Sequence, residues 1–410
     1  MRILNGFFLS ALMLPAADRL IATGAVIDGA TRQPIAGATI LVHSAGVRTG
    51  YDLFCPTCYV DCGKRAVTDA QGGFSIPSLS PDLIFNLLVV REGYGAGFIR
   101  KLDPQSGAAP PIALKPRISP EDPRQVVRGK VVDAQAQPVR EALISQQGII
   151  FDQGRQFGDM DWIDLVAVSN REGEFEMAYA KPAKSMILEV APRGMAPKLA
   201  VLPTGLPGRQ IVAVTDGATI RGRLVSGGKP VPNAEFVLST HSRTSGTFYQ
   251  DIRIGTNNEG EFVITNTPAG RVWDLFPKMD SLAPKGLAAP LTFVATKDDG
   301  QEIQLGDIEA KPGYSLRGRF ALSDGLPIAP GMRLNLFMDR LPDRQSVILP
   351  PDGTFEFKGL AKGIYTLLPA VKGYLKQDPE QPIEILIEGN RAGFNVLLNP
   401  VAAVEKAGKN

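Results

Sequence analysis

The sequence predicts an all-β protein built as a tandem array of four small seven-stranded β-sandwich modules. One pattern recurs along its 410 residues: a strand with a glycine, a Gly/Pro turn, a second strand, a variable loop, and a polar turn followed by Gly-x-Phe. The anchor glycines are Gly24, Gly129, Gly222 and Gly318. Their spacing of about 100 residues suits a self-sufficient β domain. The 43 Gly and 33 Pro residues favour many short strands joined by turns.

The fourth copy shows the expected strands most clearly. Residues 314–320 alternate apolar and polar side chains, as a half-buried strand does. Asp, Gly and Pro at 323–327 favour a turn, and Asp352-Gly353 marks the tip of a hairpin. Seven short strands fit a two-sheet sandwich. We expect them at 314–320, 332–337, 347–349, 354–357, 364–368, 383–387 and 392–398.

The polar turn before each Gly-x-Phe is expected to be structural. Its Asp or Asn can accept hydrogen bonds from the turn backbone, while glycine takes a positive φ and phenylalanine enters the core. A calcium site is the alternative, but each copy supplies at most one carboxylate. The turns are Thr68-Asp69 to Phe74, Asn170 to Phe175, Asn258 to Phe262 and Asp352 to Phe357. Trp273 aligns with Tyr365 of the fourth copy and is expected in the core.

A family resemblance rests on two stretches of the chain. Gly24-Ala-Val-Ile-Asp28, with Gly37-Ala and then Gly73-Phe74, resembles the carboxypeptidase regulatory-like domain, and so does the stretch from Asp352-Gly353 to Tyr365. The resemblance implies a transthyretin-like, Ig-like sandwich grouped with carbohydrate-binding-like folds. Copy two departs most, with Glu141-Ala142 where the family has Gly-Ala. We predict domains at 18–118, 119–216, 217–312 and 313–402, and a polar tail at 403–410.

The first residues have the layout of a secretory signal peptide. Arg2 precedes the apolar run 7–14, and Ala16-Ala17 precede Asp18. We predict removal of residues 1–17 and a secreted or periplasmic protein. No later apolar run of about 18 residues is present, so no membrane span is expected. The 44 basic and 42 acidic residues are balanced without a long Lys/Arg block, which argues against a nucleic-acid partner.

Residues for catalysis are scarce in this sequence. His43 and His241 are the only histidines, and neither lies in a zinc-peptidase motif or beside a Gly-x-Ser-x-Gly elbow. We therefore predict a protein that is not an enzyme and has no cofactor, metal site or catalytic residue. A hydrolase with paired carboxylates between modules stays open as an alternative, because such residues carry no sequence signature.

The loop after the second strand of module 1 holds all three cysteines, Cys55, Cys58 and Cys62. In an exported protein such a cluster is expected to form one disulfide and leave one thiol. Three pairings are possible. Cys58 with Cys62 is favoured, because Pro56 stiffens the link between Cys55 and Cys58. The alternative is a metal site of three thiolates with His43.

The equivalent loop of module 2 carries a candidate sugar site. Trp162 stands among Asp159, Asp161 and Asp164. An indole ring can stack on the apolar face of a pyranose, while carboxylates accept hydrogen bonds from hydroxyl groups. The alternative is that Trp162 closes the end of its own sandwich and that the aspartates are solvated.

Taken together, these features predict an exported binding or spacer protein that acts through the end loops of its modules. The expected partner is a polysaccharide, or an envelope or extracellular protein. A purely structural adaptor is the alternative in which none of the loops binds a ligand.

Overall fold

The computed structural model describes residues 19–52, 54–55, 59–157, 162–240, 252–339, 341, 343–376, 378 and 381–401. The expected signal peptide, the polar tail and the loop 241–251 lie outside them. Within this part of the chain the protein is all-β, with one four-residue α-helix, α1 (Met279–Leu282). None of its helices has the length and apolar character to cross a bilayer.

The first two sheet pairs follow one plan. The three-stranded sheet β4-β1-β7 faces the separate sheet β3-β2-β5-β6. In the same way the sheet β12-β8-β15 faces the sheet β10-β9-β13-β14, in which β11 also pairs with β9. The strands are β1 (Leu20–Asp28), β2 (Thr39–Val47), β3 (Arg65–Val67), β4 (Gly73–Leu79), β5 (Leu83–Val90), β6 (Gly97–Leu102), β7 (Ile112–Leu114), β8 (Val126–Val132), β9 (Leu143–Phe151), β10 (Gly154–Phe157), β11 (Val166–Val168), β12 (Glu174–Ala178), β13 (Ser185–Ala191), β14 (Lys198–Pro203) and β15 (Gln210–Ala213).

The last two sheet pairs repeat the plan. The sheet β17-β16-β20, in which β24 also pairs with β16, faces the sheet β19-β18-β21-β23. The sheet β29-β26-β33-β31 faces the sheet β28-β27-β30-β32. The strands are β16 (Ala218–Ser226), β17 (Lys229–Pro230), β18 (Glu235–Ser239), β19 (Ile252–Gly255), β20 (Glu261–Thr267), β21 (Arg271–Pro277), β22 (Leu287–Ala288), β23 (Thr292–Thr296), β24 (Glu302–Glu309), β25 (Lys311–Pro312), β26 (Tyr314–Leu322), β27 (Arg333–Met338), β28 (Arg344–Ile348), β29 (Thr354–Leu360), β30 (Gly363–Ala370), β31 (Tyr374–Leu375), β32 (Ile383–Ile387) and β33 (Arg391–Pro400).

The first strand of each pair is central to its sheet. It pairs antiparallel with the strand that carries Gly-x-Phe and parallel with a strand near the end of the same copy, as β26 does with β29 and β33. The same relations hold for β1, β8 and β16. The all-β sandwich prediction is confirmed. The seven strands expected in the fourth copy coincide with β26 to β30, β32 and β33.

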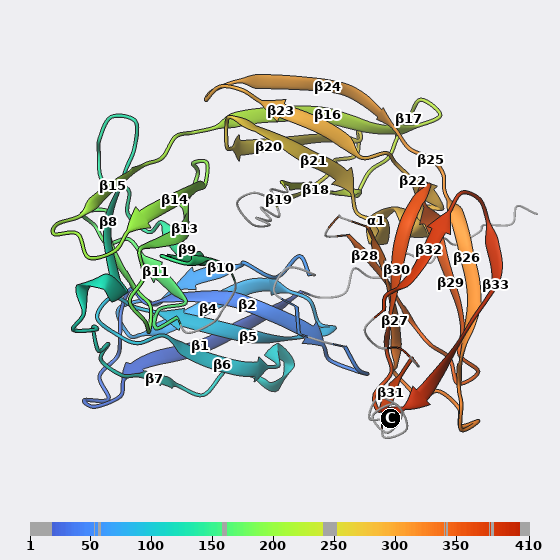
Figure 1. Cartoon of the computed structure of the whole chain (residues 1–410), viewed down its shortest axis with the longest axis horizontal. Coiled ribbons are helices and arrows are strands. Elements are labelled where there is room, and N and C mark those ends of the chain that lie inside the picture. Colours follow the sequence, from blue (N-terminus) through green and yellow to red (C-terminus); the bar gives the residue numbers. More distant parts are fainter. Residues whose placement is uncertain are drawn as a thin grey trace, which may run out of the picture.

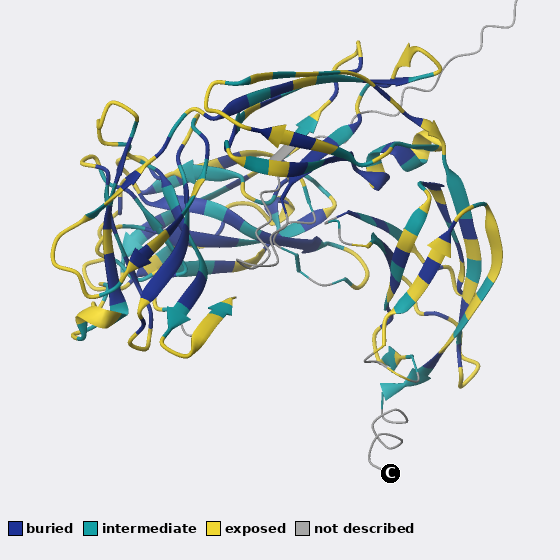
Figure 2. Cartoon of the chain, turned by 45° about the horizontal axis from the view of Figure 1, so that its top comes forward, coloured by how far each residue is buried: buried dark blue, intermediate teal, exposed yellow. Residues whose placement is uncertain are grey.

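The buried hydrophobic side chains of the described residues gather into four separate clusters. Each cluster lies between the two sheets of one pair, and Trp273 and Tyr365 are both fully buried, as expected. We call the four sheet pairs modules 1 to 4 in chain order, and the four independent domains expected from the sequence stay a prediction. Figures 1 and 2 show the modules along an arc that brings the first and the fourth near each other.

The recurring glycine and phenylalanine face each other across two neighbouring strands. Gly24 pairs with Phe74, Gly129 with Phe175, Gly222 with Phe262 and Gly318 with Phe355. A methyl group on Gly24 or Gly318 would come within 2.7 Å of the partner ring. Glycine is therefore required, because the ring packs over its backbone.

The polar turn works as the sequence predicted. Asp69 Oδ1 accepts hydrogen bonds from the backbone N–H groups of Gln71 at 2.9 Å and Gly73 at 2.8 Å, and Gly72 has φ of 73°. Asn170 makes the equivalent bonds in module 2. In module 3 the acceptor is Asn257 and not the expected Asn258.

Candidate functional site

Trp162 lies at one end of module 2, half-buried against its core. Its ring meets the buried Tyr179 ring edge-on, with centroids 5.2 Å apart, and the two residues form an isolated β-bridge. Phe151, at the end of β9, contacts Tyr179 as well, with centroids 6.1 Å apart. Phe151 and Trp162 therefore both pack against the buried side chain of Tyr179. Asp159 and Asp161 lie outside the described residues.

An open groove of about 930 Å³ is lined by Phe151, whereas Trp162 and Tyr179 are not among its lining residues. Phe151 lines it together with the turn between β9 and β10 and the segment that leads into β13. Polar side chains accompany this aromatic wall, among them Gln153, Gln156 and Thr204. A groove of this size with one aromatic wall and several polar groups has the make-up of a ligand site.

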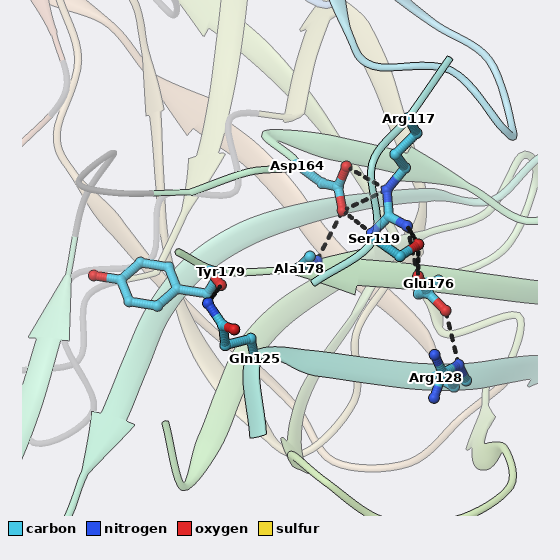
Figure 3. Close-up of polar contacts among 8 residues, drawn as sticks. All are labelled: Arg117, Ser119, Gln125, Arg128, Asp164, Glu176, Ala178 and Tyr179. Carbon is cyan, nitrogen blue, oxygen red and sulfur yellow. Dashed lines mark hydrogen bonds and ion pairs between the residues drawn. The ribbon is translucent and has the colours of Figure 1, made fainter. Parts of the chain in front are cut away.

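Asp164 belongs to the junction between modules 1 and 2, as Figure 3 shows. Arg117 follows β7, where its N–H donates to Gly93 O at 2.9 Å. Its Nη2 donates to Asp164 Oδ2 at 2.6 Å and its Nη1 donates to Glu176 at 2.5 Å. Asp164 also accepts the N–H of Ala178 at 2.8 Å. These bonds lock the segment between the two modules onto module 2.

The ligand role of Asp164 stays a prediction, and these contacts give it no support. The residue is 7% exposed, and both of its oxygens accept hydrogen bonds from Arg117. Burial raises the pKa of Glu176, but its hydrogen bonds and the charges of Arg117 and Arg128 outweigh burial and hold its pKa below the ordinary value. The cavity of about 260 Å³ at this junction has acidic and basic side chains that largely neutralise one another.

The cysteine loop differs from the expected pairing. Cys55 is disulfide-bonded, while Cys62 carries a thiol whose Sγ lies 3.4 Å from Cys55 O. The predicted bond between Cys58 and Cys62 is therefore wrong at Cys62, and Cys58 lies outside the described residues. The alternative metal site fails too, because a disulfide sulfur is no thiolate ligand. His43 lies inside β2, with its ring 5.5 Å from that of Phe98.

The same loop joins module 1 to module 4. Gly50 and Gly331 bring their backbones together, and Tyr51 N donates to Gly331 O at 3.0 Å. Arg344 Nη1 lies 3.2 Å from Asp52 Oδ2, in an ion pair whose side chains are 12% and 4% exposed. The Arg344 guanidinium also sits 5.3 Å from the centre of the Tyr59 ring. We call these five residues and Arg344 the closing contact.

Modules 3 and 4 meet at a buried junction. Met279 of α1 packs into the core of module 4, and its N–H donates to Asp343 Oδ2 at 3.0 Å. Burial raises the pKa of Asp343 to about 7, although Lys278 and the Met279 N–H lower it. The cavity beside Asp343 is about 20 Å³, which is room for one water molecule and not for a sugar.

Several of these residues had no sequence signal. Arg117, Asp52 and Arg344 are ordinary charged residues in loops or at strand ends, and their partners come from other modules. Phe151 had a sequence signal, because it is an aromatic residue in the stretch of chain that leads to Trp162.

No protein-family model and no curated relative matches the chain. Among solved structures, a streptococcal ancillary pilin is 14% identical, with 67% of this chain and 99% of that chain covered and a TM-score of 0.23. The Bacillus anthracis TIE protein is 12% identical, with 94% and 74% covered and a TM-score of 0.21. GBS52, the minor pilin of Streptococcus agalactiae, is 13% identical, with 45% and 96% covered and a TM-score of 0.24. TM-scores this low support no inference.

Proposed function

We propose that this chain is a non-catalytic, exported binding protein of four carboxypeptidase regulatory-like modules, and that it binds a polysaccharide at the Trp162 end of module 2. The observation that carries the proposal is that Phe151 and Trp162 both pack against Tyr179, and that Phe151 also lines an open groove. Rigid aromatic rings next to polar groups suit a pyranose, whose faces are apolar and whose edges carry hydroxyl groups. Asp159 and Asp161 are the proposed hydroxyl acceptors.

The closing contact favours a binding protein over a spacer. A spacer separates its ends, whereas modules 1 and 4 of this chain touch through Gly50, Gly331 and the ion pair of Asp52 with Arg344. Locked junctions hold surface loops at fixed positions, which lowers the entropy cost of binding an extended ligand.

The carboxylates at the module junctions support a role without catalysis. Asp164 and Glu176 are bound to Arg117, and Asp343 lies beside a cavity too small for a sugar. A glycoside hydrolase needs two carboxyl groups on either side of a bound substrate. The cavity beside Asp343 has no such space, and the carboxylates of Asp164 and Glu176 are held in ion pairs with Arg117.

Export is supported by the disulfide at Cys55, because disulfides persist in oxidising compartments. The apolar segment at residues 7–14 adds to this support.

A protein partner is the second candidate, favoured by an apolar strip on module 4. Ile364 and Leu386 lie opposite each other on β30 and β32, and together with Leu368 they are 46%, 51% and 48% exposed. Apolar side chains that gather on an exposed sheet face are typical of an interaction surface.

A panel of immobilised polysaccharides tests the proposal. The purified protein should be retained on at least one of them and released by the free polymer. If no polysaccharide retains the protein, the proposed polysaccharide binding is wrong and binding of a protein partner is favoured.

A further inference from the structure

The groove beside Phe151 is lined by more basic than acidic side chains. Arg124, Arg155 and Lys184 line it, against the single carboxylate of Asp152. Its volume of about 930 Å³ is at the upper end of the range for ligand sites, roughly 300–1,000 Å³. The groove therefore offers space and an excess of positive charge at the same place.

Backbone hydrogen bonds fix the walls of the groove. Ala183 N donates to Arg124 O at 3.0 Å, Lys184 N to Ile150 O at 2.8 Å, and Thr204 N to Lys184 O at 3.1 Å. These bonds tie the start of module 2 to the ends of β9, β13 and β14. The groove is therefore formed before a ligand arrives, which favours binding.

Two of the basic groups keep donors for an anion. Arg124 is held by Asp122, to which its Nε and Nη2 donate at 3.1 and 2.8 Å. A guanidinium has five N–H donors, so this pair leaves part of the group for a second partner. Lys184 is exposed and has no ion pair within the described part of the chain. Its ammonium group brings three donors.

We propose that this groove binds the anionic groups of an acidic polysaccharide. Lys184 and Arg124 pair with carboxylate or sulfate groups on the sugar, and Phe151 packs against a sugar ring. The inference rests on the proposed function, because it names the class of glycan bound at this end of module 2. Because the groove is open, this binding weakens as salt screens the charges.

Pairs of polymers with the same sugar backbone, one charged and one uncharged, test the inference. Polygalacturonate is compared with its methyl ester, and dextran sulfate with dextran, by isothermal titration calorimetry on the full chain. We expect at least one acidic polymer to bind about tenfold or more tightly than its uncharged counterpart. The two arms distinguish carboxylate from sulfate. Poly-L-glutamate controls for negative charge without sugar, and equal binding of it would overturn the assignment to a sugar.

Two variants locate the binding. Lys184→Glu should weaken binding of the acidic polymer by about tenfold or more, and Lys130→Glu, in the other sheet of module 2, should leave it unchanged. Equal losses in both variants would overturn the inference. If the uncharged polymers bind as tightly as the acidic ones, the inference fails while the proposed function stands. If no polysaccharide binds, the proposed function fails as well.

Discussion

Phe355 lies directly opposite Gly318 in the pairing of β26 with β29, and a methyl group on Gly318 would come within 2.7 Å of the Phe355 ring. Each module repeats this relationship between its first strand and the strand after its polar turn. The phenylalanine that follows about 40 to 50 residues later in the same pattern therefore packs over the anchor glycine.

Gly318→Ala should lower the free energy of unfolding by about 1–3 kcal/mol, because the added methyl group forces the Phe355 ring or the Phe394 carbonyl to move. Gly389→Ala is the matched control in module 4, since nothing lies within 4 Å of its added methyl group. Urea denaturation of both variants measures the difference. Equal stabilities would show that the ring does not need the space over Gly318.

The sequence predicted the sandwich fold well because the fold depends on local signals. Alternating strands, Asp-Gly turns and core aromatics such as Trp273 and Tyr365 each act within one module. The arrangement of modules had no such signal. It depends on contacts such as Asp52 with Arg344, which are 292 residues apart and belong to different modules.

Arg344→Gln should open the closing contact. The substitution leaves Asp52 buried without its cation, and breaking such a pair costs about 3–5 kcal/mol. Small-angle X-ray scattering should show a larger radius of gyration, with circular dichroism unchanged because each module keeps its own core. Lys362→Gln removes the exposed pair with Glu388 and should change neither measurement, since surface pairs contribute about 0–1 kcal/mol. Scattering curves that coincide for wild type and Arg344→Gln would contradict the contact.

Asp343 should make the protein less stable as the pH rises. Its pKa is raised from the ordinary value of 3.8 to about 7 by burial, so the folded state binds a proton that the unfolded state has released. The resulting destabilisation is absent below pH 3.8, grows between the two pKa values and is complete above pH 7. The two pKa values set its upper limit at about 4 kcal/mol.

Asp343→Asn isolates this effect, because an amide oxygen can still accept the Met279 N–H while carrying no charge. We expect the variant to be more stable than wild type at pH 8 and nearly equal to it at pH 4. Thermal melting across this range measures the difference. A pH-independent gap between the two proteins would show that Asp343 ionises normally.

The cysteines should give one reactive thiol in the unreduced, denatured protein and three after reduction. Cys62 carries that thiol and Cys55 is disulfide-bonded. Cys62→Ser should therefore abolish the thiol signal before reduction, which is read with a thiol-specific chromophore. A thiol signal that persists in this variant before reduction would show that the thiol belongs to another cysteine and that Cys62 is disulfide-bonded.

The candidate site was only partly accessible to prediction. Trp162 and its acidic neighbours stood out in the sequence, because an aromatic among carboxylates has a local chemical meaning. The ion pair of Asp164 had no sequence signal, because its partner Arg117 lies 47 residues earlier and reaches it only once modules 1 and 2 have packed. The basic groove was equally hidden, since Arg124 and Lys184 come to line one groove only through backbone bonds such as that from Ala183 N to Arg124 O.

The central claim is that module 2 binds a polysaccharide through Trp162, and calorimetric titration of wild type and Trp162→Ala tests it most directly. Removing a stacked aromatic commonly costs upwards of about 2 kcal/mol, so the variant should bind the retained polysaccharide roughly thirtyfold more weakly or worse. Phe293→Ala removes a 69% exposed aromatic of module 3 and should bind normally. Because Trp162 also packs on Tyr179, the titrations are made at a temperature at which both proteins are folded. Unchanged affinity in folded Trp162→Ala would contradict the claim.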